Sequence, residues 1–269
     1  MSLRTDLLFV LSLLLTSCSF GQLTIICETD SQLEEISAIE YDFKRKVFWV
    51  IEDSGNSNEL IALNDSGAVV HQIELKNAKN DDWEDLTKDN DGNLYIGDFG
   101  NNDRSRNEYI IYKINETDLD SKKVIAGETR FKLGKGNKEQ DFEAFFEYKD
   151  HFYLFSKNDQ KTTVYEIPNE GGDQDAKKLY SYSLKGKENE ITSAAIGPNN
   201  GTVVLLNGEK IWKLSRFEGT DFFSGKIEAL YFDHSSQKEG VCFWSKREVL
   251  ITDERKKDVG GYIYSFKLK

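Results

Sequence analysis

The chain has 269 residues, of which 38% are hydrophobic and 30% are charged, enough for one large all-β domain or two small ones. Its formal net charge of −12 makes nucleic-acid phosphates and anionic lipid poor partners, because like charges repel. The chain contains two prolines and twenty glycines, which argues against a low-complexity or disordered protein.

The N-terminus, residues 1–21, is typical of an export signal. It holds an apolar stretch, residues 7–15, that is too short to span a bilayer. Two processing sites compete. The sequence Leu-Thr-Ser-Cys has the form of a lipobox, which would make Cys18 the acylated first residue of a lipoprotein, whereas signal peptidase would cut before Gln22. We expect an exported protein, either freely secreted, in the periplasm or anchored by lipid at the cell surface.

Five short segments share one pattern: an acidic or polar residue, any residue, then Ser, Thr or Glu, a small or acidic residue, and an apolar one. They are residues 35–39, 82–86, 141–145, 190–194 and 237–241. Their central residues are 47, 59, 49 and 47 positions apart, close to the length of a four-stranded propeller blade. Further apolar runs separated by turn residues follow each segment. The pattern predicts an all-β fold, a five-bladed β-propeller of four-stranded blades, as a single domain over residues 22–269.

The two ends of the chain are predicted to complete one blade. The fifth repeat lacks a fourth strand, and the run Leu-Thr-Ile-Ile-Cys-Glu, residues 23–28, belongs to no repeat. We predict that this run is the outer strand of the last blade, where it would cover an exposed edge. A sixth blade is the alternative, but the longest interval holds no second pattern, and we interpret its extra residues 116–128 as one loop.

Polar residues at equivalent positions of the repeats are predicted to surround the axis at one face. The central residues form an inner ring: Ser37, Glu84, Glu143, Thr192 and Glu239. Loops after the second strands supply a ligand-binding mouth: Asp53, Asp98, Asn101, Asn102, Arg104, Lys157, Asn158, Asp253 and Arg255. Carboxylates that converge on one axis repel one another, and Ca²⁺, which prefers oxygen ligands, would compensate them. The ring has no His or Cys, which argues against zinc. We predict a calcium-binding ring; the alternative is that these side chains bond to backbone amides or channel waters.

The inner ring resembles that of the calcium-dependent soluble nucleotidases, or apyrases. The resemblance implies that a central Ca²⁺ bound by the five ring residues supports hydrolysis of nucleoside di- and triphosphates. Residues 82–86 (DWEDL) and 97–102 (GDFGNN) also resemble paired motifs of secreted bacterial propellers, which are loosely related to phytase-like and esterase-like propellers.

Several functions remain open. The first is a module whose mouth, with a central cation, binds a small anionic ligand or another protein. The second is a calcium-dependent phosphohydrolase of phosphate anhydrides or esters, in which Glu84 or Glu143 would orient the attacking water as the catalytic residue. Glycoside hydrolysis by paired carboxylates is a third. We favour the binding module, and expect a monomer without a nucleic-acid partner.

Overall fold

A computed structural model of the protein describes residues 22–158, 160–186, 188–257 and 259–268. The expected export signal, residues 1–21 with Cys18, lies outside the described residues. The described part of the chain is built almost wholly of strands, together with one short 3-10 helix, η1 (Glu116–Asp118). None of its helices has the length and apolarity needed to cross a membrane.

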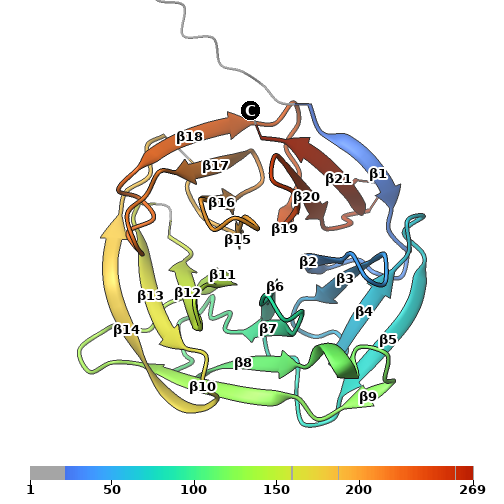
Figure 1. Ribbon diagram of the computed structural model, residues 1–269, viewed down its shortest axis with the longest axis horizontal. Helices are drawn as coiled ribbons and strands as arrows, with labels where there is room; N and C mark the ends of the chain where they lie inside the picture. The colour runs from blue at the N-terminus through green and yellow to red at the C-terminus, as the bar shows by residue number, and fades with distance from the viewer. Residues whose placement is uncertain (1–21, 159, 187, 258, 269) are drawn as a thin grey trace, which may run out of the picture.

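The strands radiate around a central axis and form a disc (Figure 1). The first sheet contains β2 (Ile36–Asp42), β3 (Val47–Glu52), β4 (Glu59–Leu63), β5 (Val69–Leu75) and β9 (Lys123–Val124). A second, eight-stranded sheet contains β6 (Trp83–Lys88), β7 (Leu94–Asp98), β8 (Tyr109–Ile114), β10 (Gly127–Leu133), β14 (Gly172–Tyr182), β13 (Thr162–Pro168), β12 (His151–Ser156) and β11 (Phe142–Glu147). The third contains β15 (Ser193–Ile196), β16 (Thr202–Leu206), β17 (Lys210–Ser215) and β18 (Lys226–Tyr231). The fourth contains β19 (Lys238–Ser245), β20 (Glu248–Asp253), β21 (Tyr262–Lys267) and β1 (Thr24–Glu28).

The innermost strands form a closed ring around the axis. In turn, β2 contacts β6, β6 contacts β11, β11 contacts β15, β15 contacts β19, and β19 returns to β2. Hydrophobic side chains fill the spaces between neighbouring sheets, with Trp49, Trp83 and Trp212 almost completely buried there. The fold is therefore all-β and propeller-like, and its repeated segments lie where five inner strands begin.

The two ends of the chain meet in one sheet, as predicted. Strand β1 pairs antiparallel with β21, so that Thr24 lies opposite Ser265. Arg255 reinforces this closure, because its guanidinium donates to the Glu28 carboxylate and to the backbone oxygen of Thr29, each at 2.9 Å. The N-terminal strand thus covers the outer edge that β21 would otherwise expose.

The interpretation of residues 116–128 as one loop is wrong. The segment contains η1 and the short strand β9, which pairs in parallel with β5. Backbone amides of β5 and the residue after it donate to this segment, from Glu74 to Lys122 and from Lys76 to Val124. The insertion thus satisfies the outer edge of the first sheet, a need that the sequence pattern does not reveal.

Candidate functional site

The ring residues lie at β-bulges, one extra residue inserted at the start of an inner strand. Where β2, β6, β11 and β19 pair with their neighbours, the register skips one residue each time: Ser37, Glu84, Glu143 and Glu239. A bulged residue is unpaired in the ladder, and the local bend redirects its side chain. Thr192 instead directly precedes β15 and donates its backbone N–H to Leu206.

The three glutamates of this ring, Glu84, Glu143 and Glu239, lie in a poorly solvated site. The side chains of Glu84 and Glu143 leave only 8% and 4% of their residue surface exposed. Burial raises the pKa of both well above the usual range, and Glu143 adds to the effect on Glu84. Burial, followed by repulsion from Glu254, raises the pKa of Glu239 to about 8.

Lys157, in the loop after β12, supplies a positive charge at this point. Its ammonium contacts Glu143 Oε1. Burial lowers the pKa of Lys157, but attraction to Glu143, Glu239 and Glu84 outweighs it, so the pKa stands above its usual value. The second oxygen of Glu143, Oε2, is buried and has no hydrogen-bond partner among the residues that the structure describes. One oxygen of this buried carboxylate is therefore still without a hydrogen-bond donor.

Asp53, Asp82 and Glu84 form a close group of carboxylates. One oxygen of each lies within 4.8 Å of the others. Burial, followed by repulsion from Asp82 and Glu35, raises the pKa of Asp53 to about 6. Gly100 passes so close to Asp82 and Glu84 that any side chain there would collide with their carboxylates. Because Gly100 has no side chain, the carboxylate oxygens of Asp82 and Glu84 can lie close to the backbone here.

We call the carboxylates and the lysine gathered here the acidic mouth. It comprises Asp53, Asp82, Glu84, Glu143, Lys157, Glu239 and Glu254. Asp82 does not belong to the predicted site, although it occupies the acidic first position of a repeated segment, which was the signal available for it. Burial, followed by repulsion from Asp53 and Glu35, raises the pKa of Glu254 to about 7. The arrangement can hold a hard cation, because it offers several carboxylate oxygens, although the Lys157 ammonium competes for them.

The hydroxyl protons of Ser37 and Thr192 are used between neighbouring inner strands. Ser37 Oγ donates to the Trp83 carbonyl at 2.9 Å, and Thr192 Oγ1 donates to the Lys238 carbonyl at 2.7 Å. This matches the alternative in which ring side chains bond to the backbone. Each hydroxyl oxygen nevertheless keeps lone pairs with which it can accept a further bond.

Of the predicted mouth residues, Asp53 and Lys157 interact with the inner carboxylates, and several others fasten loops. Asp98 is fully buried and accepts from Arg106 at 2.8 Å. Asn101 is also buried; its backbone N–H donates to Asp141 at 2.8 Å. These two residues shape the loop after β7 from within.

The remaining predicted residues occupy turns or the surface. Asp253 is fully buried and accepts from the Tyr262 backbone N–H and from two hydroxyl groups, while Arg255 closes the last sheet. Asn158 caps its own turn, and Asn102 and Arg104 are exposed. The sequence pattern located these loops at one end of the disc but could not separate turn-forming side chains from free ones.

Asp85, directly after Glu84, is a buried hub on the axis. Its carboxylate accepts from the backbone N–H groups of Leu86, Phe145 and Ala194 at 3.0, 3.0 and 3.3 Å, and from Ser193 Oγ at 2.9 Å. Burial raises the pKa of Asp85 well above its usual range, while these four donors act in the opposite direction. The hub joins three inner strands directly beneath the acidic mouth.

The fourth position of the other repeats explains why there is space for this hub. It is occupied by Ala38, Ala144, Ser193 and Gly240, all buried. A Cβ on Gly240 would lie 2.9 Å from the backbone of Ala38, closer than real Cβ atoms approach. Small residues in these four repeats therefore leave the axis free for the Asp85 carboxylate of the second repeat.

Comparison with known proteins agrees with the fold. The family model described as "SdiA-regulated" matches residues 27–209. Among solved structures, a luciferin-regenerating enzyme, also a β-propeller, is 13% identical and superimposes with a TM-score of 0.51, over 89% of this chain and 94% of that one. None of the curated proteins is similar enough in sequence to count as a relative. At such low identity the structural likeness concerns the fold alone.

Proposed function

We propose that this chain, which belongs to the SdiA-regulated family, binds a divalent cation at the acidic mouth and uses it to hold a small anionic ligand or another protein. The observation that carries the proposal is the convergence of Asp53, Asp82 and Glu84 to within 4.8 Å. The unpartnered buried oxygen of Glu143 supports it. Ca²⁺ is the first candidate, because it accepts many carboxylate, carbonyl and water oxygens in a flexible geometry.

The proposal includes a disc of five blades. Its support is the pairing of the strands, which divides into five antiparallel groups of four: β2–β5, then β6–β8 with β10, then β11–β14, β15–β18, and β19–β21 with β1. The second and third groups share the eight-stranded sheet through a parallel pairing of β10 with β14. On this division each group contributes one residue to the predicted inner ring, in chain order Ser37, Glu84, Glu143, Thr192 and Glu239.

Binding is favoured over phosphohydrolysis by the state of Glu143. A residue that activates water as a general base needs a free carboxylate within reach of that water. The Lys157 ammonium instead engages one oxygen of Glu143, and its charge stabilises the ionised carboxylate and so weakens it as a base. An ammonium beside a cation is better suited to attract the negative groups of a ligand.

Export of the protein rests on the signal-like residues 1–21, and lipid anchoring through Cys18 stays a prediction.

Calcium titration tests the proposal. We expect Ca²⁺ to raise the melting temperature of residues 22–269 after chelator treatment, because a ligand that binds the folded state stabilises it. Asp82→Asn should weaken Ca²⁺ binding in calorimetry by roughly tenfold or more, since ligand charge tunes calcium affinity. Asp91→Asn, the same change at an exposed turn, should leave the affinity unchanged.

Two outcomes would count against this function. A melting temperature indifferent to Ca²⁺ would remove the cation from the mouth. Calcium-dependent phosphate release from ATP, ADP or p-nitrophenyl phosphate would replace the binding module with the hydrolase.

The pH dependence of stability gives a second prediction. Burial raises the pKa values of Asp53, Glu254 and Glu239 to about 6, 7 and 8 in the folded protein, above their ordinary values of 3.8, 4.5 and 4.5. The folded state therefore keeps protons that the unfolded chain has already lost. Without cation, the free energy of unfolding should fall as the pH rises through this window, from about 3.8 to about 8.

Calcium should weaken or reverse that trend, because it binds the deprotonated carboxylates and gains affinity as the pH rises. Urea unfolding at several pH values, with Ca²⁺ and with chelator, measures both curves. Parallel curves would contradict a cation site formed by these carboxylates.

A further inference from the structure

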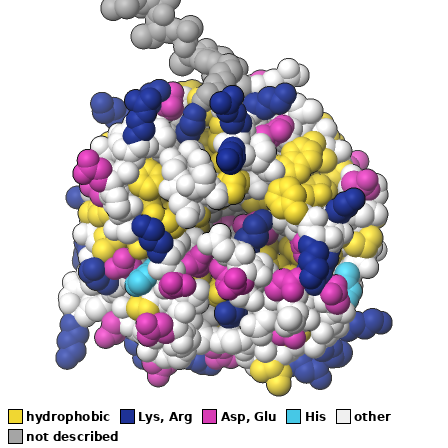
Figure 2. All heavy atoms as spheres, viewed as in Figure 1, with side chains coloured by type: hydrophobic (Ala, Val, Ile, Leu, Met, Phe, Trp, Pro, Cys, Tyr) yellow, Lys and Arg dark blue, Asp and Glu magenta, His cyan; other side chains and the backbone are white. Residues whose placement is uncertain are grey.

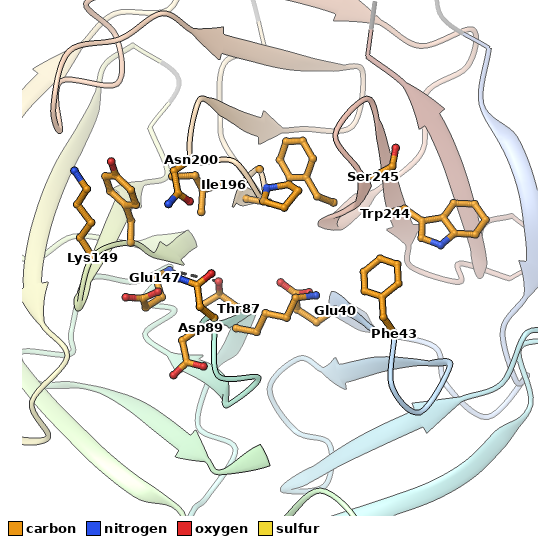
Figure 3. A pocket seen from close by; sticks show the side chains of 17 residues that line it. Glu40, Phe43, Thr87, Asp89, Glu147, Lys149, Ile196, Asn200, Trp244 and Ser245 are labelled. Carbon is orange, nitrogen blue, oxygen red and sulfur yellow. Dashed lines mark hydrogen bonds and ion pairs between the residues drawn. The ribbon is translucent and has the colours of Figure 1, made fainter. Parts of the chain in front are cut away.

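A second cavity lies at the opposite end of the axis from the acidic mouth. The mouth is formed where the inner strands begin, and this cavity of about 320 Å³ is lined by residues where they end, among them Glu40, Lys88, Glu147 and Ile196 (Figure 3). Its volume lies in the range of small-molecule sites, roughly 300–1,000 Å³. The cavity shares no lining residue with the mouth.

One side of the cavity is apolar and aromatic. Phe43 projects from the turn after β2 with 59% of its surface exposed, and Phe243 and Trp244 come from the end of β19. The Tyr41 ring packs against two of these side chains edge to face. Its centroid lies 4.8 Å from that of Phe43 and 6.2 Å from that of Trp244. In Figure 2 the centre of the disc is hollowed, with hydrophobic side chains gathered on one side of it and acidic and basic ones on another.

The opposite side carries a buried carboxylate, Glu147 at the end of β11. Its Oε1 accepts from the backbone N–H of Asp150 at 2.8 Å. Burial, then repulsion from Asp89 and Asp150, raises the pKa of Glu147, against attraction from His151. Its negative charge is therefore poorly compensated where it faces the cavity.

The lysine between these two sides is already neutralised. The Lys88 ammonium binds Glu40 Oε2 at 2.6 Å and the backbone oxygen of Tyr41 at 2.8 Å. Lys149 is exposed and lies over the Tyr148 ring, 4.8 Å from its centroid. Two carboxylates of the lining are thus left to attract a ligand, Glu147 and Asp89, because their hydrogen-bond donors are neutral groups.

We propose that this cavity binds a small amphipathic amine, with its ammonium on Glu147 and its apolar body against Phe43, Phe243 and Trp244. A desolvated carboxylate favours an ammonium as its partner, and the aromatic side chains offer apolar surface to the body of such a ligand. An anionic ligand would face Glu147 with Lys88 already occupied by Glu40, and a neutral sugar would leave Glu147 without a counter-charge. The inference does not depend on a cation at the mouth.

Calorimetry with three probes tests the proposal on residues 22–269 kept in chelator: 4-phenylbutylamine, 4-phenylbutyrate and methyl β-glucoside. We expect the amine to bind, with an affinity that falls as salt is added. Glu147→Gln should weaken it by about tenfold, the equivalent of about 1.4 kcal/mol. Phe43→Ala should weaken it several-fold, and because Phe43 is exposed this variant should fold even if Glu147→Gln does not.

Matched variants separate this site from its surroundings. Val70→Ala, which truncates another exposed apolar side chain, and Asp82→Asn at the mouth should leave amine binding unchanged. The proposal is overturned if no amine binds, if the carboxylate or the sugar binds as tightly, or if Phe43→Ala has no effect. Loss of binding in Asp82→Asn would assign the amine to the mouth instead.

Discussion

Asp85→Asn is expected to lower the free energy of unfolding by about 3 kcal/mol or more, the largest effect of any single substitution proposed for this chain. The four groups that surround the carboxylate all donate: Leu86 N, Phe145 N, Ala194 N and Ser193 Oγ. An amide of the same size turns an NH₂ toward at least one of these donors, and leaves it without an acceptor in a site with no exposure.

Chemical denaturation at neutral pH measures this change, with the exposed Asp91→Asn as control. A surface change of this kind is usually within about 0.5 kcal/mol of neutral. If Asp85→Asn were equally mild, the carboxylate would not join the inner strands, and a protonated, weakly bonded Asp85 would have to replace the hub described above. Chelator-treated and calcium-loaded protein should lose similar stability, because the hub lies beneath the mouth rather than in it.

The repeats made the fold predictable. Each five-residue segment marks the beginning of an inner strand, because the axis demands small or specifically bonded residues at one position and an apolar residue next to it. The strand count then placed residues 23–28 against the last strands, where β1 is found. The sequence does not predict strand β9, because two residues are too few to show a periodicity. Their pairing with β5 depends on an open edge that exists only in the assembled sheet.

The site was only partly predictable, for a reason that lies in the bulges. In a regular strand, adjacent residues lie on opposite faces. A site predicted from the third position of each repeated segment, such as Glu84, therefore leaves out the next residue, Asp85. At the bulge Glu84 is redirected and leaves the ladder, and both Glu84 and Asp85 reach the axis region. Asp82, two positions earlier, joins the same cluster. No pattern of residue types shows where a register will slip.

The sequence predicts a ring whose carboxylates repel one another until a cation binds. In the structure a lysine side chain of the same chain lies among these carboxylates. Lys157 reaches Glu143 from a loop, so its charge already offsets part of the repulsion. The sequence placed Lys157 among the mouth residues without its partner, because the loop conformation decides where a long, flexible side chain ends.

Lys157→Met is expected to have two opposite effects that separate its role from a purely structural one. In chelator the variant should lose about 3 kcal/mol of unfolding free energy, because removal of one partner leaves Glu143 buried and uncompensated. In excess Ca²⁺ most of that loss should disappear. The ammonium and the cation both seek the same carboxylates and repel each other, so a site without Lys157 gains more from Ca²⁺ than the parent does.

Calorimetric Ca²⁺ titration and thermal unfolding of the parent and the variant measure the difference. At a calcium concentration about 100 times the dissociation constant, binding stabilises by about 2.7 kcal/mol, which is comparable to the expected loss. Lys161→Met, at an exposed position near the same loop, should change neither quantity. If Lys157→Met lowered calcium affinity, Lys157 would be organising the cation site rather than competing for it. Electrostatic competition predicts the opposite sign, so the direction of that one change decides whether the lysine occupies the site of the cation or supports it.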